Sequence, residues 1–277
     1  MAKYLDLFTD YGFKKIFGEE ANKNFLIDFF NALLPDAFPI TDLAFKKTEQ
    51  LGNRDDRRAV YDIYCVNERG ERFIVEMQKI KRDFFKDRTL YYSTFPIREQ
   101  AEKGEWDFNL KSVFCVSLMD FVFDDEYEKR HPDKVIVDIA LRDRSGKEFY
   151  GKLQYIYLEM PNFRKTEQEL VTRLDKWLYF IKNLENFENI PEIFKNEIVF
   201  IEAMKKAEIA RFNQDELYQY EADLKVYRDF INGLNTARRE GKKEGILEMV
   251  KKLREKGVSF EIISQTTGLT NPEIEQL

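Results

Sequence analysis

Apolar side chains near the start of the chain recur at the spacing of helices. Residues 9–18 place them on one face of a short helix, and residues 22–34 continue with a longer amphipathic helix. Both helices are expected to pack on a sheet, because such apolar faces must be covered. The two faces consist of Phe13, Ile16 and Phe17 in the first helix and Phe25, Leu26, Phe29, Phe30, Leu33 and Leu34 in the second.

After Pro39 the pattern changes to that of strands. Over residues 72–78 apolar and other positions alternate with a period of two, which places Glu76 and Gln78 on the same face of one strand. A turn at residues 67–70, rich in turn-forming side chains, joins this strand to the one before it. Further strands are expected over residues 40–46, 58–66, 113–123, 134–143 and 148–160, with a helix over 83–102.

From about residue 166 onward the pattern is helical, with stretches near 191–206 and 214–233. The chain then becomes richer in charge and ends in two short helices around a Thr-Gly-Leu turn, where Thr270 and Glu273 form a capping box. Three parts are therefore expected: a core over residues 1–165, a helical part packed on it over 166–234, and a charged helical tail over 235–277.

Composition places the chain among globular proteins. Of its 277 residues, 43% are hydrophobic and 35% charged, which excludes disordered, collagen-like and disulfide-scaffold classes. The formal net charge of −6 means that nucleic-acid binding would need a local basic patch. No apolar run is long enough to span a bilayer, and Asp6 and Asp10 interrupt any signal-peptide core, so we expect a cytoplasmic protein that does not enter the membrane.

The chain has little material for cysteine or histidine chemistry. Its two cysteines, Cys65 and Cys115, lie in strand-like stretches and are expected to be buried free thiols rather than a disulfide. Its one histidine, His131, stands before a proline in a charged turn. This leaves almost no material for a histidine-based zinc site or a Ser-His-Asp triad, so we expect the chemistry to use carboxylates, lysines and amides.

Two carboxylates in neighbouring apolar strands are the strongest candidates for that chemistry. Asp62 and Glu76 are separated by a hairpin turn, and a carboxylate in such a strand needs a cationic partner. A Mg²⁺ ion is one such partner, because it prefers one or two carboxylates together with water and phosphate oxygens. The residues alone also allow the alternative that both carboxylates are exposed and pair with Arg or Lys.

The ordered combination of four segments resembles the PD-(D/E)XK nuclease family transposases, also called recombination-promoting nucleases. The segments are Thr9-Asp10-Tyr11-Gly12-Phe13-Lys14-Lys15-Ile16-Phe17-Gly18, Tyr61-Asp62-Ile63, Ile74-Val75-Glu76-Met77-Gln78 and Arg88-Thr89-Leu90-Tyr91-Tyr92. The resemblance covers roughly residues 4 to 230. It implies an α/β, restriction-endonuclease-like core with a mixed central sheet flanked by helices and a helical C-terminal extension, and Mg²⁺-dependent hydrolysis of DNA phosphodiester bonds in recombination or mobile elements.

On that pattern Asp62 and Glu76 are the metal ligands, with the backbone carbonyl of Met77 as a third oxygen. Gln78 takes the place of the superfamily lysine, and it can orient the attacking water but offers no titrating amine. Supporting roles are assigned to Lys14, Arg88 and Tyr91, and to Asp10, for which the N-cap of the first helix is the alternative. Candidates for contacts to the DNA backbone, in a locally basic segment, are Lys79, Lys81 and Arg82.

Two questions stay open from the sequence. The first is whether the chain cuts DNA or is a nucleic-acid-binding or protein-interaction module that cleaves weakly or not at all. The second is the role of the tail, for which DNA reading, docking on the core and homodimerisation compete, with Gly241 and Gly245 spaced for close approach of two helices. The many phenylalanines are interpreted as core residues rather than base-stacking groups.

Overall fold

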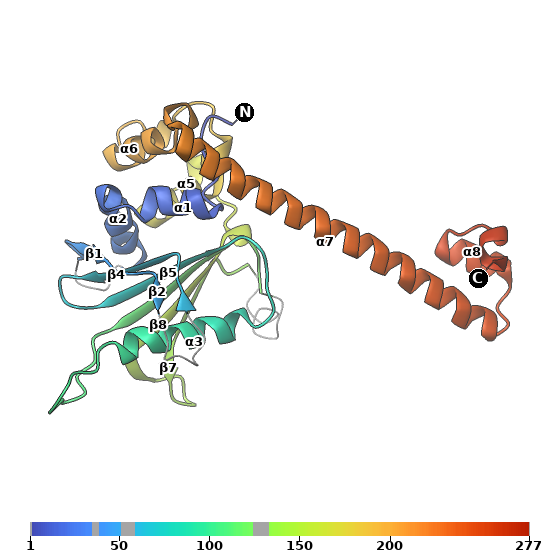
Figure 1. Cartoon of the computed structure of the whole chain (residues 1–277), viewed down its shortest axis with the longest axis horizontal. Coiled ribbons are helices and arrows are strands. Elements are labelled where there is room, and N and C mark those ends of the chain that lie inside the picture. Colours follow the sequence, from blue (N-terminus) through green and yellow to red (C-terminus); the bar gives the residue numbers. More distant parts are fainter. Residues whose placement is uncertain (1, 35–38, 51–58, 124–132, 277) are drawn as a thin grey trace. The chain divides into compact units, whose positions relative to one another are not determined.

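A mixed sheet of six strands forms the centre of the computed structural model, which describes residues 2–34, 39–50, 59–123 and 133–276. The strand order is β1-β4-β5-β6-β8-β7 (Figure 1). Strands β5, β6 and β8 run parallel, whereas β1, β4 and β7 join the sheet antiparallel to their neighbours. The strands are β1 (Leu43–Phe45), β4 (Ile63–Asn67), β5 (Arg72–Gln78), β6 (Val113–Met119), β7 (Ile136–Arg142) and β8 (Glu148–Glu159), with β2 (Glu49–Gln50) and β3 (Ala59–Val60) pairing separately.

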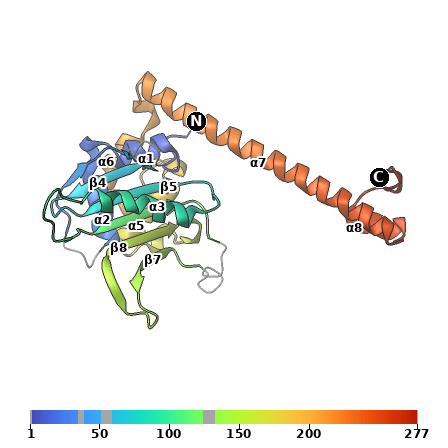
Figure 2. The same ribbon diagram turned by 60° about the horizontal axis from the view of Figure 1, so that its bottom comes forward.

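Helices cover both faces of this sheet, as expected. In Figures 1 and 2, α1, α2, α5 and α6 lie on one face and α3 lies on the other. The helices are α1 (Asp10–Phe17), α2 (Lys23–Leu33), α3 (Phe85–Arg98), α5 (Arg173–Asn183), α6 (Ile198–Ala207), α7 (Gln214–Glu255), α8 (Phe260–Thr267) and α9 (Asn271–Glu275). Short 3-10 turns occur at Glu20–Asn22, Met160–Asn162, Glu167–Glu169, Leu184–Asn186, Glu192–Phe194 and Ile209–Arg211.

Aromatic side chains fill the space between the sheet and the helices of the first face. Trp177 is fully buried there, and its ring packs on Phe17, Phe29 and Phe200 with centroids 4.6–6.2 Å apart. The interpretation of the phenylalanines as core is confirmed for the buried ones, which include Phe13, Phe17, Phe25, Phe29, Phe30, Phe73, Phe180, Phe194 and Phe200.

On the opposite face, hydrogen bonds between hydroxyl groups fix α3 to the sheet. The hydroxyls of Thr89 and Tyr157 are 2.7 Å apart, and those of Ser93 and Tyr155 are also 2.7 Å apart. Because Thr89 and Ser93 are one turn apart, both contacts lie on the same side of the helix. They set the position of the first turn of α3, which contains Arg88.

The two cysteines are buried and free, which confirms the prediction. Cys65 lies in β4 and Cys115 in β6, and burial raises the pKa of both thiols well above the ordinary value. Thiolate chemistry at these positions is therefore disfavoured. His131 lies outside the described residues.

The C-terminal helices differ in one respect from the expectation. Helix α7 runs without a break from Gln214 to Glu255, whereas the sequence predicted an end near residue 233. Gly233, Gly241 and Gly245 lie inside it, and each is expected to cost about 1 kcal/mol relative to alanine. Strong helix formers such as Arg, Glu, Lys and Leu surround them and offset that cost.

The described chain divides into two compact units, residues 1–220 and 221–277. The second unit has its own small core of Val250, Ile263 and Ile274, and its last helix begins with the predicted capping box of Thr270 and Glu273. The finer division at residues 165 and 234 stays a prediction. Among the described residues, no helix is both long and apolar enough to cross a bilayer.

Candidate active site at the end of strand β5

Strand β5 carries the first two candidate residues on one face, as its alternating pattern predicted. Glu76 and Gln78 point to the side of the sheet that α3 covers, because both contact Arg88 of that helix. Glu76 is 6% exposed. A carboxylate buried this deeply in a strand is costly unless a cation compensates it.

Asp62 also lies beside Glu76, but its backbone is not part of a strand as the sequence predicted. It lies at a bend between β3 and β4 rather than inside a strand. Its Oδ2 accepts a hydrogen bond of 2.7 Å from the backbone N–H of Met77. Since Ile63 pairs with Val75 in antiparallel register, Asp62 comes opposite Glu76. The bend thus frees the Asp62 carboxylate to bind the neighbouring strand's backbone beside Glu76.

Burial raises the pKa of both carboxylates and so opposes their ionisation. The pKa of Asp62 is raised to about 6, by burial above all and also by the charge of Asp10, while the Met77 N–H, Lys14 and Arg88 act in the opposite direction. The pKa of Glu76 is raised well above its usual range by burial and then by the charge of Asp62. Such a pair favours either a shared proton or an added cation.

Arg88 is the nearest compensating cation. One nitrogen of its guanidinium, Nη2, donates to Gln78 Oε1 at 2.8 Å and to Glu76 Oε2 at 3.3 Å. The guanidinium also lies 5.0 Å from the ring centre of Phe85 and 5.5 Å from that of Tyr92. On the other side of Gln78, Nε2 donates to the Ile80 carbonyl at 2.9 Å. The Gln78 side chain is therefore held in one orientation.

The carboxylate oxygens at this site fit a divalent cation that is bound by only a few protein groups. Glu76 Oε1 is buried and has no hydrogen-bond partner in the part of the chain that the structure describes, which leaves a carboxylate oxygen unsatisfied beside Asp62. Within the described residues no group of three or more Asp, Glu, His or Cys could hold a metal. Two carboxylates, completed by water, backbone or phosphate oxygens, match the way Mg²⁺ is usually held.

Two further predicted residues come from α1 and act on the pair electrostatically. Lys14 Nζ lies 2.7 Å from Asp10 Oδ1, and both charges influence the pKa of Asp62. Asp10 does not cap its helix. Thr9 does so, because its hydroxyl accepts from the Gly12 N–H at 3.0 Å. This removes the capping alternative for Asp10, which lies in the first turn of α1.

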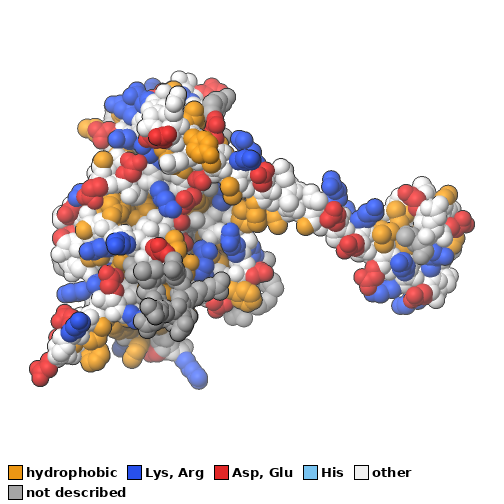
Figure 3. All heavy atoms as spheres, in the orientation of Figure 1, with side chains coloured by type: hydrophobic (Ala, Val, Ile, Leu, Met, Phe, Trp, Pro, Cys, Tyr) orange, Lys and Arg blue, Asp and Glu red, His pale blue; other side chains and the backbone are white. Residues whose placement is uncertain are grey.

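The remaining candidates differ in their surroundings. Lys79 is 16% exposed, and its ammonium pairs with Asp6, a buried residue that the sequence did not single out. Lys81 and Arg82 are exposed in the loop between β5 and α3. Tyr91, on α3, packs edge-on against Phe95 with centroids 5.3 Å apart. On the face seen in Figure 3, cationic and acidic side chains are mixed rather than gathered by sign.

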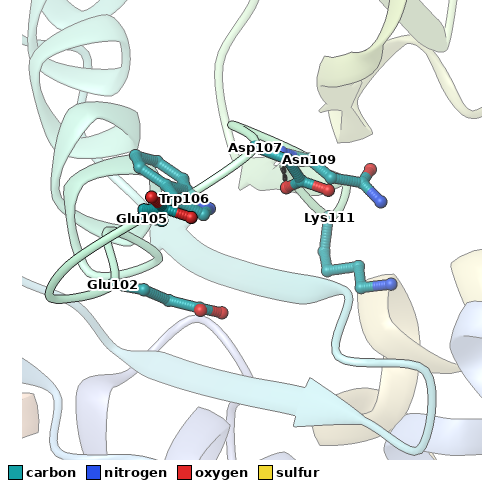
Figure 4. A pocket seen from close by; sticks show the side chains of 6 residues that line it. All are labelled: Glu102, Glu105, Trp106, Asp107, Asn109 and Lys111. Carbon is teal, nitrogen blue, oxygen red and sulfur yellow. Dashed lines mark hydrogen bonds between the residues drawn. The ribbon is translucent and has the colours of Figure 1, made fainter.

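A surface cavity of about 690 Å³ lies away from these residues, in the loop that follows α3. Figure 4 shows its lining, in which the charged side chains are three carboxylates and one lysine and none of the predicted site residues occurs. An acidic wall of this kind repels phosphate groups. The lining consists of Glu102, Glu105, Trp106, Asp107, Asn109 and Lys111.

In a comparison with known families, residues 7–237 match the family described as PD-(D/E)XK nuclease family transposase. The match includes Asp62, Glu76, Gln78 and Arg88. The mixed six-stranded sheet flanked by helices, with a helical C-terminal region, agrees with that nuclease fold. Searches of curated proteins and of solved structures found no match.

Proposed function

Since the chain belongs to the PD-(D/E)XK nuclease family transposases, we propose that it is a Mg²⁺-dependent DNA endonuclease of the cytoplasm that acts in recombination or on mobile elements. The observation that carries this proposal is the pair of half-buried Asp62 and buried Glu76, in which Glu76 Oε1 has no hydrogen-bond partner among the described residues. A protein that only bound DNA would gain nothing from two carboxylates whose burial opposes their ionisation.

Each residue of the site has a distinct role in this proposal. Asp62 and Glu76 hold the ion, and the Met77 carbonyl contributes a third oxygen. When bound, Mg²⁺ supplies Lewis-acid polarisation of the scissile phosphate and a more acidic attacking water. Gln78 positions that water. Gln78 Oε1 accepts one hydrogen bond from Arg88, and Gln78 Nε2 donates one to the Ile80 carbonyl. One lone pair of Oε1 and one N–H of Nε2 remain for the water.

Arg88 and Lys14 complete the electrostatics. Arg88 neutralises Glu76 in the absence of metal, and its hydrogen bond holds the Gln78 amide in one orientation. Lys14 lowers the pKa of both carboxylates and thereby favours the ionised forms that bind a metal. Lys81 and Arg82 are exposed near the end of β5, where they can neutralise phosphates of the DNA backbone without reading its sequence.

Removal of the metal tests the proposal. We expect wild-type protein with Mg²⁺ to convert supercoiled plasmid into nicked and linear forms, and we expect EDTA to stop the reaction until Mg²⁺ is added in excess. Glu76→Gln should be inactive, whereas Glu102→Gln, in the cavity beyond α3, should cut like wild type. A parallel assay with RNA of the same sequence identifies the substrate class.

The alternative is a nuclease fold that binds nucleic acid or protein but cleaves weakly or not at all. The glutamine at position 78 favours it, because no lysine is present there to deprotonate water. Wild-type protein that binds DNA tightly, yet leaves plasmid intact with Mg²⁺ and with Mn²⁺, would establish this alternative. Equal cutting by wild type and Glu76→Gln would instead show that the site lies elsewhere.

We also propose that two copies of the chain pair through the C-terminal helical region. Helix α7 exposes Val226, Phe230 and Leu234 at four-residue intervals, so they form one apolar stripe. Light scattering should then give twice the chain mass of 33.2 kDa. Phe230→Glu should return the mass to that of one chain, and Lys225→Glu should not. A wild-type monomer at high concentration would refute pairing.

A further inference from the structure

The loop that joins β5 to α3 ends in an aromatic residue with unusual exposure. Phe84 is 79% exposed, although it lies between Gln78 and Arg88 in the chain. Its neighbour Phe85 is buried, and the Phe85 ring contacts those of Phe121 and Tyr157. Of two consecutive phenylalanines, one therefore fills the core while the other points to solvent.

The backbone of Phe84 is also strained. Its φ of 59° and ψ of 28° lie in the left-handed region, which favours glycine and disfavours a bulky side chain. The conformation is fixed, because the Phe84 carbonyl accepts the first helical hydrogen bond of α3 from the Arg88 N–H at 2.9 Å. Glycine or asparagine would adopt the same left-handed backbone conformation with less strain. Strain of this kind at the edge of a site points to a function for the side chain.

The surroundings of Phe84 identify the chemistry of its ligand. Lys81 and Arg82 are exposed in the same loop, and Lys86 and Arg88 follow in the first turn of α3, so cations outnumber the two acids of this segment, Asp83 and Asp87. A flat apolar ring beside cationic side chains matches a nucleic-acid strand, in which the base offers a π face and the backbone offers negative charge. A base is available for such contact only where it is unpaired, because a duplex buries both of its faces.

From these observations we propose that Phe84 stacks on an unpaired base beside the phosphate that the site attacks. This inference rests on the proposed nuclease function and adds a substrate class to it, namely DNA with a single-stranded or unpaired position at the cut. The ring binds the base, Lys81 and Arg82 neutralise the adjoining backbone, and Asp62 and Glu76 lie at the end of β5 that leads into this loop.

A second exposed phenylalanine supplies a matched control. Phe108 has a φ of 57° and is 74% exposed, so its backbone and exposure resemble those of Phe84. Its ring, however, packs at a tilt on that of Trp106, with centroids 4.5 Å apart, in the loop after α3 that carries Glu105 and Asp107. Neighbouring carboxylates repel a DNA backbone. Phe108→Ala is therefore expected to leave DNA binding unchanged.

The test measures binding without cleavage. Single-stranded oligonucleotides that carry the fluorescent base 2-aminopurine are titrated with full-length protein in Ca²⁺, alongside duplex of the same sequence. Wild type should quench the fluorophore and bind single strands more tightly than duplex. Phe84→Leu keeps an apolar side chain but no ring, and should lose the quenching and weaken single-strand binding about five- to a hundredfold, as expected for one lost stacking contact.

Three possible results distinguish a failure of the stacking proposal from a failure of the nuclease proposal. If Phe84→Leu quenches and binds like wild type, stacking by Phe84 is refuted while the nuclease proposal stands. If wild-type protein binds neither DNA form, the proposed DNA substrate is refuted and the stacking proposal falls with it. Phe84→Gly should raise the melting temperature, because strain is relieved, and still weaken binding. A lower melting temperature in Phe84→Gly would mean that the residue is structural and would overturn the proposal.

Discussion

Asp62→Asn is expected to reduce Mg²⁺-dependent plasmid cleavage by at least about a hundredfold, since loss of groups that only support metal ligands already costs about ten- to a hundredfold. The substitution should leave the local geometry unchanged. Asparagine keeps an oxygen that can accept the 2.7 Å hydrogen bond from the Met77 N–H, and it keeps the shape of the side chain. The measurement is the initial rate of nicking of supercoiled DNA at saturating Mg²⁺.

A matched control accompanies this variant. Asp107 also accepts a backbone hydrogen bond through its carboxylate, from the Asn109 N–H at 2.9 Å, but it lies in the loop after α3. Asp107→Asn should cut DNA at the wild-type rate. If Asp62→Asn cuts within a factor of two of wild type, Asp62 is not a metal ligand and the assignment of the site is wrong.

The same variant should be more stable than wild type at neutral pH when metal is absent. The folded-state pKa of Asp62 is raised to about 6 by burial, so the stabilisation from its protonated form is present below about pH 4 and lost as the pH rises through 6. The loss amounts to about 3 kcal/mol for a shift of this size. Removing the Asp62 charge also lowers the pKa of Glu76, which eases its ionisation.

Urea unfolding in EDTA across this pH range checks that expectation. The difference in unfolding free energy between Asp62→Asn and wild type should grow with pH, and Mg²⁺ should stabilise wild type only. A constant difference from pH 5 to pH 7.5 would show that Asp62 ionises freely in the folded protein. In Asp62→Asn, stability should therefore increase while cleavage activity decreases, as expected for a charge that destabilises the fold but is needed for activity.

Trp177→Ala is expected to lower the free energy of unfolding by about 3–5 kcal/mol, the usual cost of emptying a large buried site. Trp177 is fully buried and contacts Phe17, Phe29, Phe180 and Phe200. Its indole N–H also donates to Asp28 Oδ1 at 2.6 Å. Because collapse around such a rigid aromatic cluster is limited, most of the lost contact energy will not be recovered.

The second tryptophan provides the comparison. Trp106 lies in the loop after α3 and packs on the exposed Phe108, so Trp106→Ala should cost less than about 1 kcal/mol. Equilibrium unfolding in urea, followed by circular dichroism at the helix band, reports both values. Equal destabilisation by the two substitutions would contradict the placement of Trp177 at the centre of the core.

Much of the fold followed from periodicity. Alternation over residues 72–78 predicted strand β5 and the common face of Glu76 and Gln78, because successive side chains of a strand point to opposite sides. The four-residue recurrence of phenylalanines predicted α2 and its buried face. These patterns are local consequences of backbone geometry, so one sequence suffices to detect them.

Other features arise between segments that are distant in the chain. Asp62 was expected within a strand, yet it occupies a bend whose geometry depends on the Met77 N–H of the next strand. The pairing of Lys79 with Asp6 joins residues 73 positions apart. Whether α7 continues past its glycines depends on the balance of several weak propensities. Local patterns carry no information about such long-range partners.

The sequence by itself determined the order of strands and helices, the family resemblance later matched over residues 7–237, and the residues Asp62, Glu76 and Gln78 as candidates. Only the tertiary structure decided that Asp62 lies against strand β5 beside Glu76, that Arg88 bridges Glu76 and Gln78, and that Phe84 faces solvent while Phe85 fills the core. The reason is physical. Secondary structure follows from side-chain pattern along the chain, whereas burial, pKa and strain depend on which distant segments pack together.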